Sequence, residues 1–184
     1  MTEPRNYRRL EGSELRHTED ERRLTPAKES ERLSATIVLR RRPDGPPVPE
    51  PDHYVRTPPS ERPRMSEQAF AARYGAEPGE IEQVAAFARS RGLTVAETNA
   101  ARRTVVISGT VGQFNEAFSI ELHNYEHEIQ RSPRAEPETE TYRSYDGFIQ
   151  VPAELAQIIV GVFGLDNRRI TKRNAATAPP SPSR

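Results

Sequence analysis

The sequence lacks several features that would assign a protein class at once. It has no cysteine, which excludes disulfide bonds and thiol chemistry. Its 27 Lys and Arg residues balance 27 Asp and Glu residues, so net charge gives no general attraction to nucleic acid or to an anionic membrane. No stretch approaches the roughly 20 apolar residues of a membrane-spanning helix. The N-terminus lacks the apolar segment of a secretory signal, so export by the standard route is not supported.

Common catalytic and phosphate-binding motifs are also missing. The nucleophile motif G-x-S-x-G does not occur. The segment SGTVGQ (108–113) contains two glycines but not the lysine and hydroxyl pair of a phosphate loop. Two apolar segments that are candidate strands, 35–40 and 103–109, carry no aromatic residue that could stack on RNA bases. We therefore expect no catalytic residue, no nucleic-acid partner and no membrane partner.

Two of the four histidines lie among glutamates, in a group formed by Glu121, His123, Glu126, His127 and Glu128. A zinc site needs three or four ligands that converge from fixed positions, whereas this group follows a strand into a loop. Solvated residues at a strand edge are the favoured interpretation, and we expect no metal or cofactor. His17 and His53 lie in segments expected to be flexible and belong to no such group.

Composition divides the chain into three parts. Only 34% of the residues are hydrophobic, there are 17 prolines, and the apolar residues concentrate between Ser66 and Leu165. Residues 1–33 are highly charged, which predicts a disordered or weakly helical N-terminal extension. Residues 34–166 are the expected domain, with a proline-rich surface loop over 41–64. Residues 167–184 are expected to be a flexible C-terminal linker.

Local patterns predict the elements of that domain. Ser66 can cap the helix 66–75, Pro78 suits the first turn of the helix 78–92, and Thr110 with Gln113 has the spacing of a capping box. Apolar residues at helical spacing after Pro152 predict a fourth helix that ends at Gly164. The expected helices are 66–75, 78–92, 110–118 and 152–164. The expected strands are 35–40, 93–100, 103–109, 119–125 and 141–151, with a polar hairpin or loop over 126–140.

This order of elements predicts an α+β fold of the ferredoxin-like, split β-α-β type, with an antiparallel sheet and helices on one face. The strands ATIVL (35–39) and TVVI (104–107) are apolar on both faces, although the helices can cover only one. Either the long loop or the terminal helix covers the second face, or this face is exposed and binds a partner protein. The predicted partner interface comprises Val38, Val106, Tyr145 and Phe148.

Four segments together resemble the activation domain, or prodomain, of kumamolisin-like serine-carboxyl peptidases of the sedolisin family. They are ATIVLRRR (35–42), FAARYGAEPGEIEQVAAFARSRGL (70–93), RRTVVISGTVGQFNEAFSIEL (102–122) and TYRSYDGFIQVPAELAQIIVGVFGLDNR (141–168). The most specific pieces are GTVGQFNEAF (109–118) and YRSYDG (142–147), with the later V-P-A and G-L-D. The resemblance covers residues 35–169 in order.

The resemblance implies a ferredoxin-like prodomain that assists the folding of a peptidase and holds it inactive until the pH falls. It also implies an extracellular location. The family's catalytic Ser-Glu-Asp set and calcium site belong to the peptidase domain, and nothing in this sequence matches them. Three possibilities stay open, namely an orphan prodomain, a gene fragment and an inhibitor that acts on a separately encoded peptidase.

Two further hypotheses concern regulation. Glu121 and Asp146 lie beside apolar strands, and we expect them to form ion pairs that weaken on protonation. The expected processed linker contains Arg168, Arg169, Lys172 and Arg173. The alternative to a prodomain is a generic ferredoxin-like regulatory or ligand-binding module. An enzyme is the third possibility, against which stands the lack of any nucleophile and base constellation.

Overall fold

A four-stranded antiparallel sheet forms the centre of the fold, with strand order β4-β5-β3-β9. The computed structural model describes residues 6–48, 52, 58, 60–61, 64–129 and 136–169. The strands of the central sheet are β3 (Arg32–Leu39), β4 (Thr94–Asn99), β5 (Thr104–Thr110) and β9 (Ile159–Phe163). β3 lies between β5 and β9 and pairs with both, so its hydrogen bonds join the two halves of the sheet.

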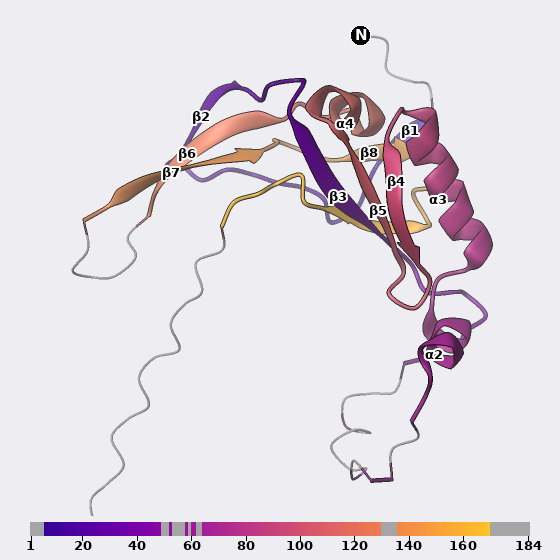
Figure 1. Cartoon of the computed structure of the whole chain (residues 1–184). Coiled ribbons are helices and arrows are strands. Elements are labelled where there is room, and N and C mark those ends of the chain that lie inside the picture. Colours follow the sequence, from indigo (N-terminus) through magenta and orange to yellow (C-terminus); the bar gives the residue numbers. More distant parts are fainter. Residues whose placement is uncertain are drawn as a thin grey trace, which may run out of the picture.

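The three helices of the described residues begin where the sequence places them. They are α2 (Glu67–Tyr74), α3 (Pro78–Ser90) and α4 (Val111–Phe118). The Ser66 side chain accepts a hydrogen bond from the Ala69 amide at the start of α2, and Thr110 and Gln113 form the expected capping box at the start of α4. α3 and α4 pack on the same face of the sheet (Figure 1).

The ferredoxin-like prediction is confirmed, but the last strand of the sheet comes from an unexpected segment. The order β3, α3, β4, β5, α4, β9 is that of a split β-α-β fold. The helix predicted over 152–164 is wrong, because residues 153–158 form turns and residues 159–163 form β9. A bulge in the pairing with β3 puts Ile159 and Val162 on the buried face although they are three residues apart. That spacing imitates a helix, whereas the β-branched run IIV favours a strand.

The N-terminal segment is part of the fold, so the prediction of a disordered or weakly helical extension is wrong for residues 6–33. β1 (Tyr7–Arg9) pairs with β8 (Gln150–Pro152), and β2 (Glu21–Pro26) pairs with β6. Leu10 is only 2% exposed and belongs to the core. Charge dominates the composition here, but a few apolar side chains and backbone pairing to distant strands are sufficient to order the segment.

A second, three-stranded sheet of order β2-β6-β7 extends away from the central sheet (Figure 1). β6 (His123–Ile129) and β7 (Glu138–Ser144) form a long hairpin, which agrees with the hairpin alternative for residues 126–140. The strand predicted over 119–125 begins later, because Ser119 adopts a left-handed conformation (φ 48°) that ends α4. Residues 41–48 contain no helix or strand, and most of the remaining predicted loop to 64 lies outside the described residues.

One continuous core lies between the central sheet and the layer made by α3, α4 and the β1–β8 pair. Its fully buried side chains include Ile37, Leu39, Val84, Val105, Ile107, Phe114, Phe118, Ile149 and Val151. None of the helices in the described part of the chain has the length and apolar character needed to cross a membrane.

Replacing Leu10 tests whether the N-terminal segment belongs to the cooperative unit. Leu10→Ala is expected to lower the free energy of unfolding by about 3 kcal/mol, because it removes a buried side chain and leaves a cavity. Urea denaturation followed by circular dichroism measures the change. Glu11→Ala, at an exposed neighbour, serves as the control and should change stability by less than about 0.5 kcal/mol. Equal stabilities of the two variants would contradict this assignment.

Candidate functional site

The second face of the central sheet is not covered by any element of the described residues. Side chains alternate along β3 and β5, so that Ile37, Val105 and Ile107 are buried whereas Thr36, Val38 and Val106 are half-buried. Register pairs place the half-buried residues on one face, since paired residues point to the same side. We call this surface the open sheet face, and it consists of Ser34, Thr36, Val38, Thr94, Glu97, Asn99, Thr104, Val106, Ser108, Gly161 and Phe163.

Phe163 is the most prominent apolar side chain of the open sheet face. Its pairing with Thr36 places it beside the centre of the face, and it is 63% exposed. The ring lies over Gly161, where a Cβ atom would come within 2.9 Å of the ring carbon Cε2. The glycine therefore permits the ring to lie against the strand. A large exposed aromatic ring on a semi-apolar surface is typical of a protein interface.

The structure assigns only two of the four predicted interface residues to this surface. Val38 and Val106 lie on the open sheet face. Tyr145 is buried in the core, and its hydroxyl donates to the Ser13 carbonyl at 2.9 Å, so its assignment to the interface is wrong. Phe148 lies elsewhere, with its ring centroid 4.9 Å from the guanidinium carbon of Arg9 on β1. Tyr145 and Phe148 were predicted because they are aromatic residues in a strand-like segment. The exposed aromatic side chain of the open sheet face is Phe163 instead.

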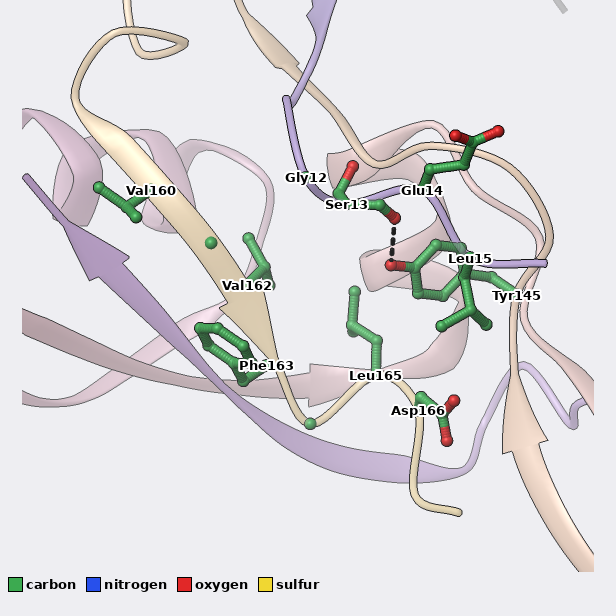
Figure 2. Close-up of a pocket in the computed structure, with 12 residues that line it drawn as sticks. Gly12, Ser13, Glu14, Leu15, Tyr145, Val160, Val162, Phe163, Leu165 and Asp166 are labelled. Atoms are coloured by element: carbon green, nitrogen blue, oxygen red, sulfur yellow. Dashed lines mark hydrogen bonds between the residues drawn. The ribbon is translucent and has the colours of Figure 1, made fainter. Parts of the chain in front are cut away.

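A groove of about 250 Å³ borders the edge strand β9, between residues 160–166 and the segment 12–15 (Figure 2). The Tyr145 hydroxyl and the Ser13 carbonyl close its inner wall with a hydrogen bond. Val160 and Phe163 line the side toward β9, and Val160 is 55% exposed. The groove therefore connects the apolar edge of the sheet to Asp166, where the chain leaves β9.

The two carboxylates predicted to respond to pH lie on either side of one arginine. The Arg23 guanidinium on β2 is 3.7 Å from Glu121 Oε2 and 3.9 Å from Asp146 Oδ2. It also donates to Nε2 of the buried His123 at 2.5 Å. The Asp146 carboxylate accepts a hydrogen bond from the Tyr125 hydroxyl at 2.9 Å. Both carboxylates are more than half exposed, so their ion pairs with Arg23 are weak individually.

A second acidic group is buried nearby and was missed by sequence reasoning. Glu21, at the start of β2, is paired with Arg168 and accepts a hydrogen bond from the Thr18 amide at 2.9 Å. The Tyr142 hydroxyl is a further donor. Burial opposes ionisation of Glu21, but the Thr18 amide, the Tyr142 hydroxyl and Arg168 together lower the pKa of its carboxyl. We call Glu21, His17, Tyr142, Asp166 and Arg168 the exit cluster.

His17 is a buried member of the exit cluster, which contradicts its expected place in a flexible segment. Its ring stacks on Tyr125 with centroids 3.8 Å apart. Nε2 lies 3.0 Å from the Tyr145 carbonyl oxygen and therefore carries a hydrogen. Nδ1 faces Glu21 Oε2 at 3.2 Å and the Tyr142 hydroxyl at 3.3 Å. The Tyr142 hydroxyl has one hydrogen, so it donates either to Glu21 or to Nδ1 of His17 and not to both.

The first residues of the predicted linker are held against β7. The Asn167 amide donates to the Arg143 carbonyl at 3.0 Å, and the Arg143 amide donates to Asn167 Oδ1 at 2.6 Å. Asp166 accepts from the buried Ser144 hydroxyl at 3.1 Å, and Arg169 lies 3.3 Å from Glu140. The prediction of a flexible segment is therefore wrong for residues 167–169. Lys172 and Arg173 lie outside the described residues.

The glutamates and histidines of the second sheet do not form a metal site. Among the described residues, no three His, Asp or Glu side chains lie close enough together to hold a metal ion. His123 is engaged by Arg23, and His127 packs against Tyr142 with ring centroids 5.0 Å apart. His53 lies outside the described residues.

Comparison with known protein families identifies the family of this chain. Residues 19–168 match the family model described as "Pro-kumamolisin, activation domain". The chain belongs to this family. The match begins at residue 19 and so includes β2, and it ends at Arg168 of the exit cluster.

Two relatives match this chain over most of its length. Kumamolisin from Bacillus sp. (strain MN-32) is 34% identical over 147 residues, which cover 80% of this chain and 25% of the relative. Tripeptidyl-peptidase sed5 from Aspergillus fumigatus is 27% identical over 164 residues, which cover 86% of this chain and 28% of the relative. The chain thus spans about a quarter of the length of these curated relatives.

The pKa of Tyr125 on β6 provides a test of the contact between the second sheet and Asp146. Burial, with the hydrogen bond to Asp146 and its charge, raises the pKa of Tyr125 to about 12. Tyrosine in an unfolded chain ionises near pH 10, so this group contributes stability that is present below about pH 10 and is lost as the pH rises toward about 12.

Asp146→Asn should lower the pKa of Tyr125, because it removes the negative charge beside the hydroxyl. An NMR titration of the tyrosine ring carbons measures it. Glu121→Gln is the control, since Glu121 contacts Arg23 and not Tyr125. If both variants left the titration of Tyr125 unchanged, the contact with Asp146 would not form in solution.

Proposed function

We propose that this chain is the propeptide of a serine-carboxyl peptidase of the sedolisin family, and that it chaperones and inhibits the peptidase catalytic domain. The open sheet face carries the proposal. It is a semi-apolar surface of Val, Thr and Ser side chains around the exposed ring of Phe163, with no cover from this chain among the described residues. The family description, an activation domain of pro-kumamolisin, and the relative tripeptidyl-peptidase sed5 support the choice of a peptidase as the partner.

The open sheet face suits a protein partner better than a small ligand. It extends over four paired strands, whereas the groove beside it lies between the edge strand β9 and the segment 12–15. Burying Val38, Val106 and Phe163 together would supply the apolar centre of an interface, with the hydroxyls of Thr36, Thr104 and Ser108 available for hydrogen bonds. A partner that covers this face completes a second layer on the sheet.

In this proposal the chain performs no catalysis. The sequence carries none of the family's catalytic Ser-Glu-Asp set, and no nucleophile and base pair stands out. The catalytic domain is joined to the propeptide in cis or binds it in trans, and both arrangements use the same face.

Phe163 is expected to dominate the affinity. Phe163→Ala should weaken inhibition of a kumamolisin-type peptidase by about 2 kcal/mol, or about 30-fold in the inhibition constant, because it removes the aromatic anchor. Progress curves of peptide hydrolysis, with purified chain added in trans near neutral pH, measure the change. Phe70→Ala is the matched control, since Phe70 is an exposed ring on α2, away from the open sheet face.

The result also separates the competing interpretations. Inhibition by the wild type that is unaffected by Phe163→Ala would remove the open sheet face from the proposal. A complete lack of binding to sedolisin peptidases near neutral and at acidic pH would favour the generic ferredoxin-like ligand-binding module instead.

We further propose that Glu121 and Asp146 contribute to release of the peptidase in acid. They share Arg23, so protonation of either carboxylate leaves that guanidinium with less compensation. The double variant Glu121→Gln, Asp146→Asn should shift the midpoint of release to higher pH, because it has already lost both charges. Inhibition measured across a pH series gives the midpoint, and Glu116→Gln on α4 is the control. An unchanged midpoint would exclude these residues as the switch.

The processed linker in this proposal contains Arg168, Arg169, Lys172 and Arg173. Of these, Arg168 and Arg169 are held by ion pairs with Glu21 and Glu140. A peptidase needs an extended, accessible chain, so cleavage near Arg168 requires these contacts to open.

A further inference from the structure

We propose that Glu21 is an acid-sensitive latch that holds residues 166–169 against β7 and releases them when its carboxyl group is protonated. The biological use of this release, exposure of the linker for cleavage, rests on the proposed function. The release itself is a property of this chain alone and can be measured without a peptidase.

Glu21 joins three parts of the chain that are distant in sequence. Its carboxylate accepts from the Thr18 amide in the N-terminal segment, from the Tyr142 hydroxyl on β7 and from Arg168 beyond β9. The carboxylate is almost fully buried, with 7% of the side chain exposed. A buried carboxylate with several donors holds each of them more firmly than an exposed ion pair does.

Arg168 connects this carboxylate to the path of the exit segment. Besides Glu21 it contacts Asp166 Oδ2 at 3.3 Å, and its guanidinium carbon lies 5.3 Å from the ring centroid of Tyr142. Its backbone amide donates to Asp166 Oδ1 at 2.7 Å. Between the two, Asn167 exchanges backbone and side-chain hydrogen bonds with Arg143. Loss of the Arg168 contact would leave this short pairing supported by the Ser144–Asp166 hydrogen bond and by the ion pair of the exposed Arg169 with Glu140.

The titratable and charged groups around Glu21 come from every element packed against it. They are His17 in the N-terminal segment, Tyr125 and His127 on β6, Glu140 and Tyr142 on β7, and Asp166 and Arg168 in the exit segment. Asp146 also reaches His17, at 3.5 Å from Nε2. Nδ1 of His17 faces the Glu21 carboxylate at 3.2 Å from the side of the N-terminal segment.

The sign of the pH dependence follows from the lowered pKa of Glu21. The latch contributes stability that is present above the ordinary range for a glutamate and is lost as the pH falls through the lowered pKa. Once Glu21 is neutral, Arg168 loses its buried charged acceptor and keeps only the contact with the Asp166 carboxylate. The weaker pairing and the hydration of the guanidinium favour opening of the exit segment.

Amide hydrogen exchange of the full chain, followed by NMR across an acid titration, tests the latch. In the wild type, exchange at the Asn167 amide, corrected for the intrinsic pH dependence, should accelerate as the Glu21 carboxyl titrates. Amides of the central strand β5 should stay protected. Glu21→Gln should make exchange at Asn167 faster by about tenfold or more near neutral pH, because the charged acceptor is gone. In this variant the corrected exchange rate should change little across the acid titration.

Two further variants keep the test decisive. Arg168→Gln removes the partner of Glu21 at a partly exposed position. It should accelerate amide exchange at Asn167 in the same way, even if Glu21→Gln fails to fold. Glu19→Gln, an exposed carboxylate in the same segment, should behave like the wild type. Protection of Asn167 that is lost only together with β5, or that is unchanged in Arg168→Gln, would overturn the proposal. Inhibition of a peptidase without this release would contradict only the latch, whereas release without inhibition would contradict only the proposed function.

Discussion

The strict alternation of side chains along β3 is the constraint on which the rest of the structure depends. β3 pairs with β5 on one side and with β9 on the other, and every second side chain is buried against α3 and α4. Because a strand has two faces, the same pairing that builds the core necessarily creates the open sheet face. The core and the open sheet face therefore depend on one register, and a slip of β3 by one residue would exchange the side chains that form them.

A second principle governs the arm formed by β2, β6 and β7. This sheet has few large apolar residues, and aromatic rings and buried charged groups hold it together, with His17 stacked on Tyr125 and Glu21 satisfied by several donors. Such polar clusters are stable only while each member keeps its partner and its charge. The core of the central sheet is held by apolar side chains instead. In the proposals above, the open sheet face binds the partner, and the exit segment beside the second sheet responds to pH.

Local signals predicted much of this architecture. Helix starts at Ser66, Pro78 and Thr110 were found because capping and proline effects act within one turn. β9 was assigned to a helix because a bulge reproduced helical spacing. The exit cluster could not be predicted from the sequence, because Glu21 and Arg168 are separated by 147 positions. Each of them, taken alone, is an ordinary charged residue in a polar segment. Val38 and Val106 followed from strand periodicity, but the exposure of Phe163 required knowing that its segment is a strand.

The place of β9 at the edge of the central sheet has a mechanical consequence. The chain passes directly from β9 into the exit segment, so a pulling force on the C-terminal end reaches β9 through residues 164–166 once the latch is open. Within the described residues β9 pairs with β3 as its only strand neighbour, so a force directed away from the sheet would load the hydrogen bonds of this pair one after another. The first pair to part is Phe163 and Thr36. A pull on the C-terminal end would therefore detach Phe163, the most exposed aromatic side chain of the open sheet face, before it disturbed the core.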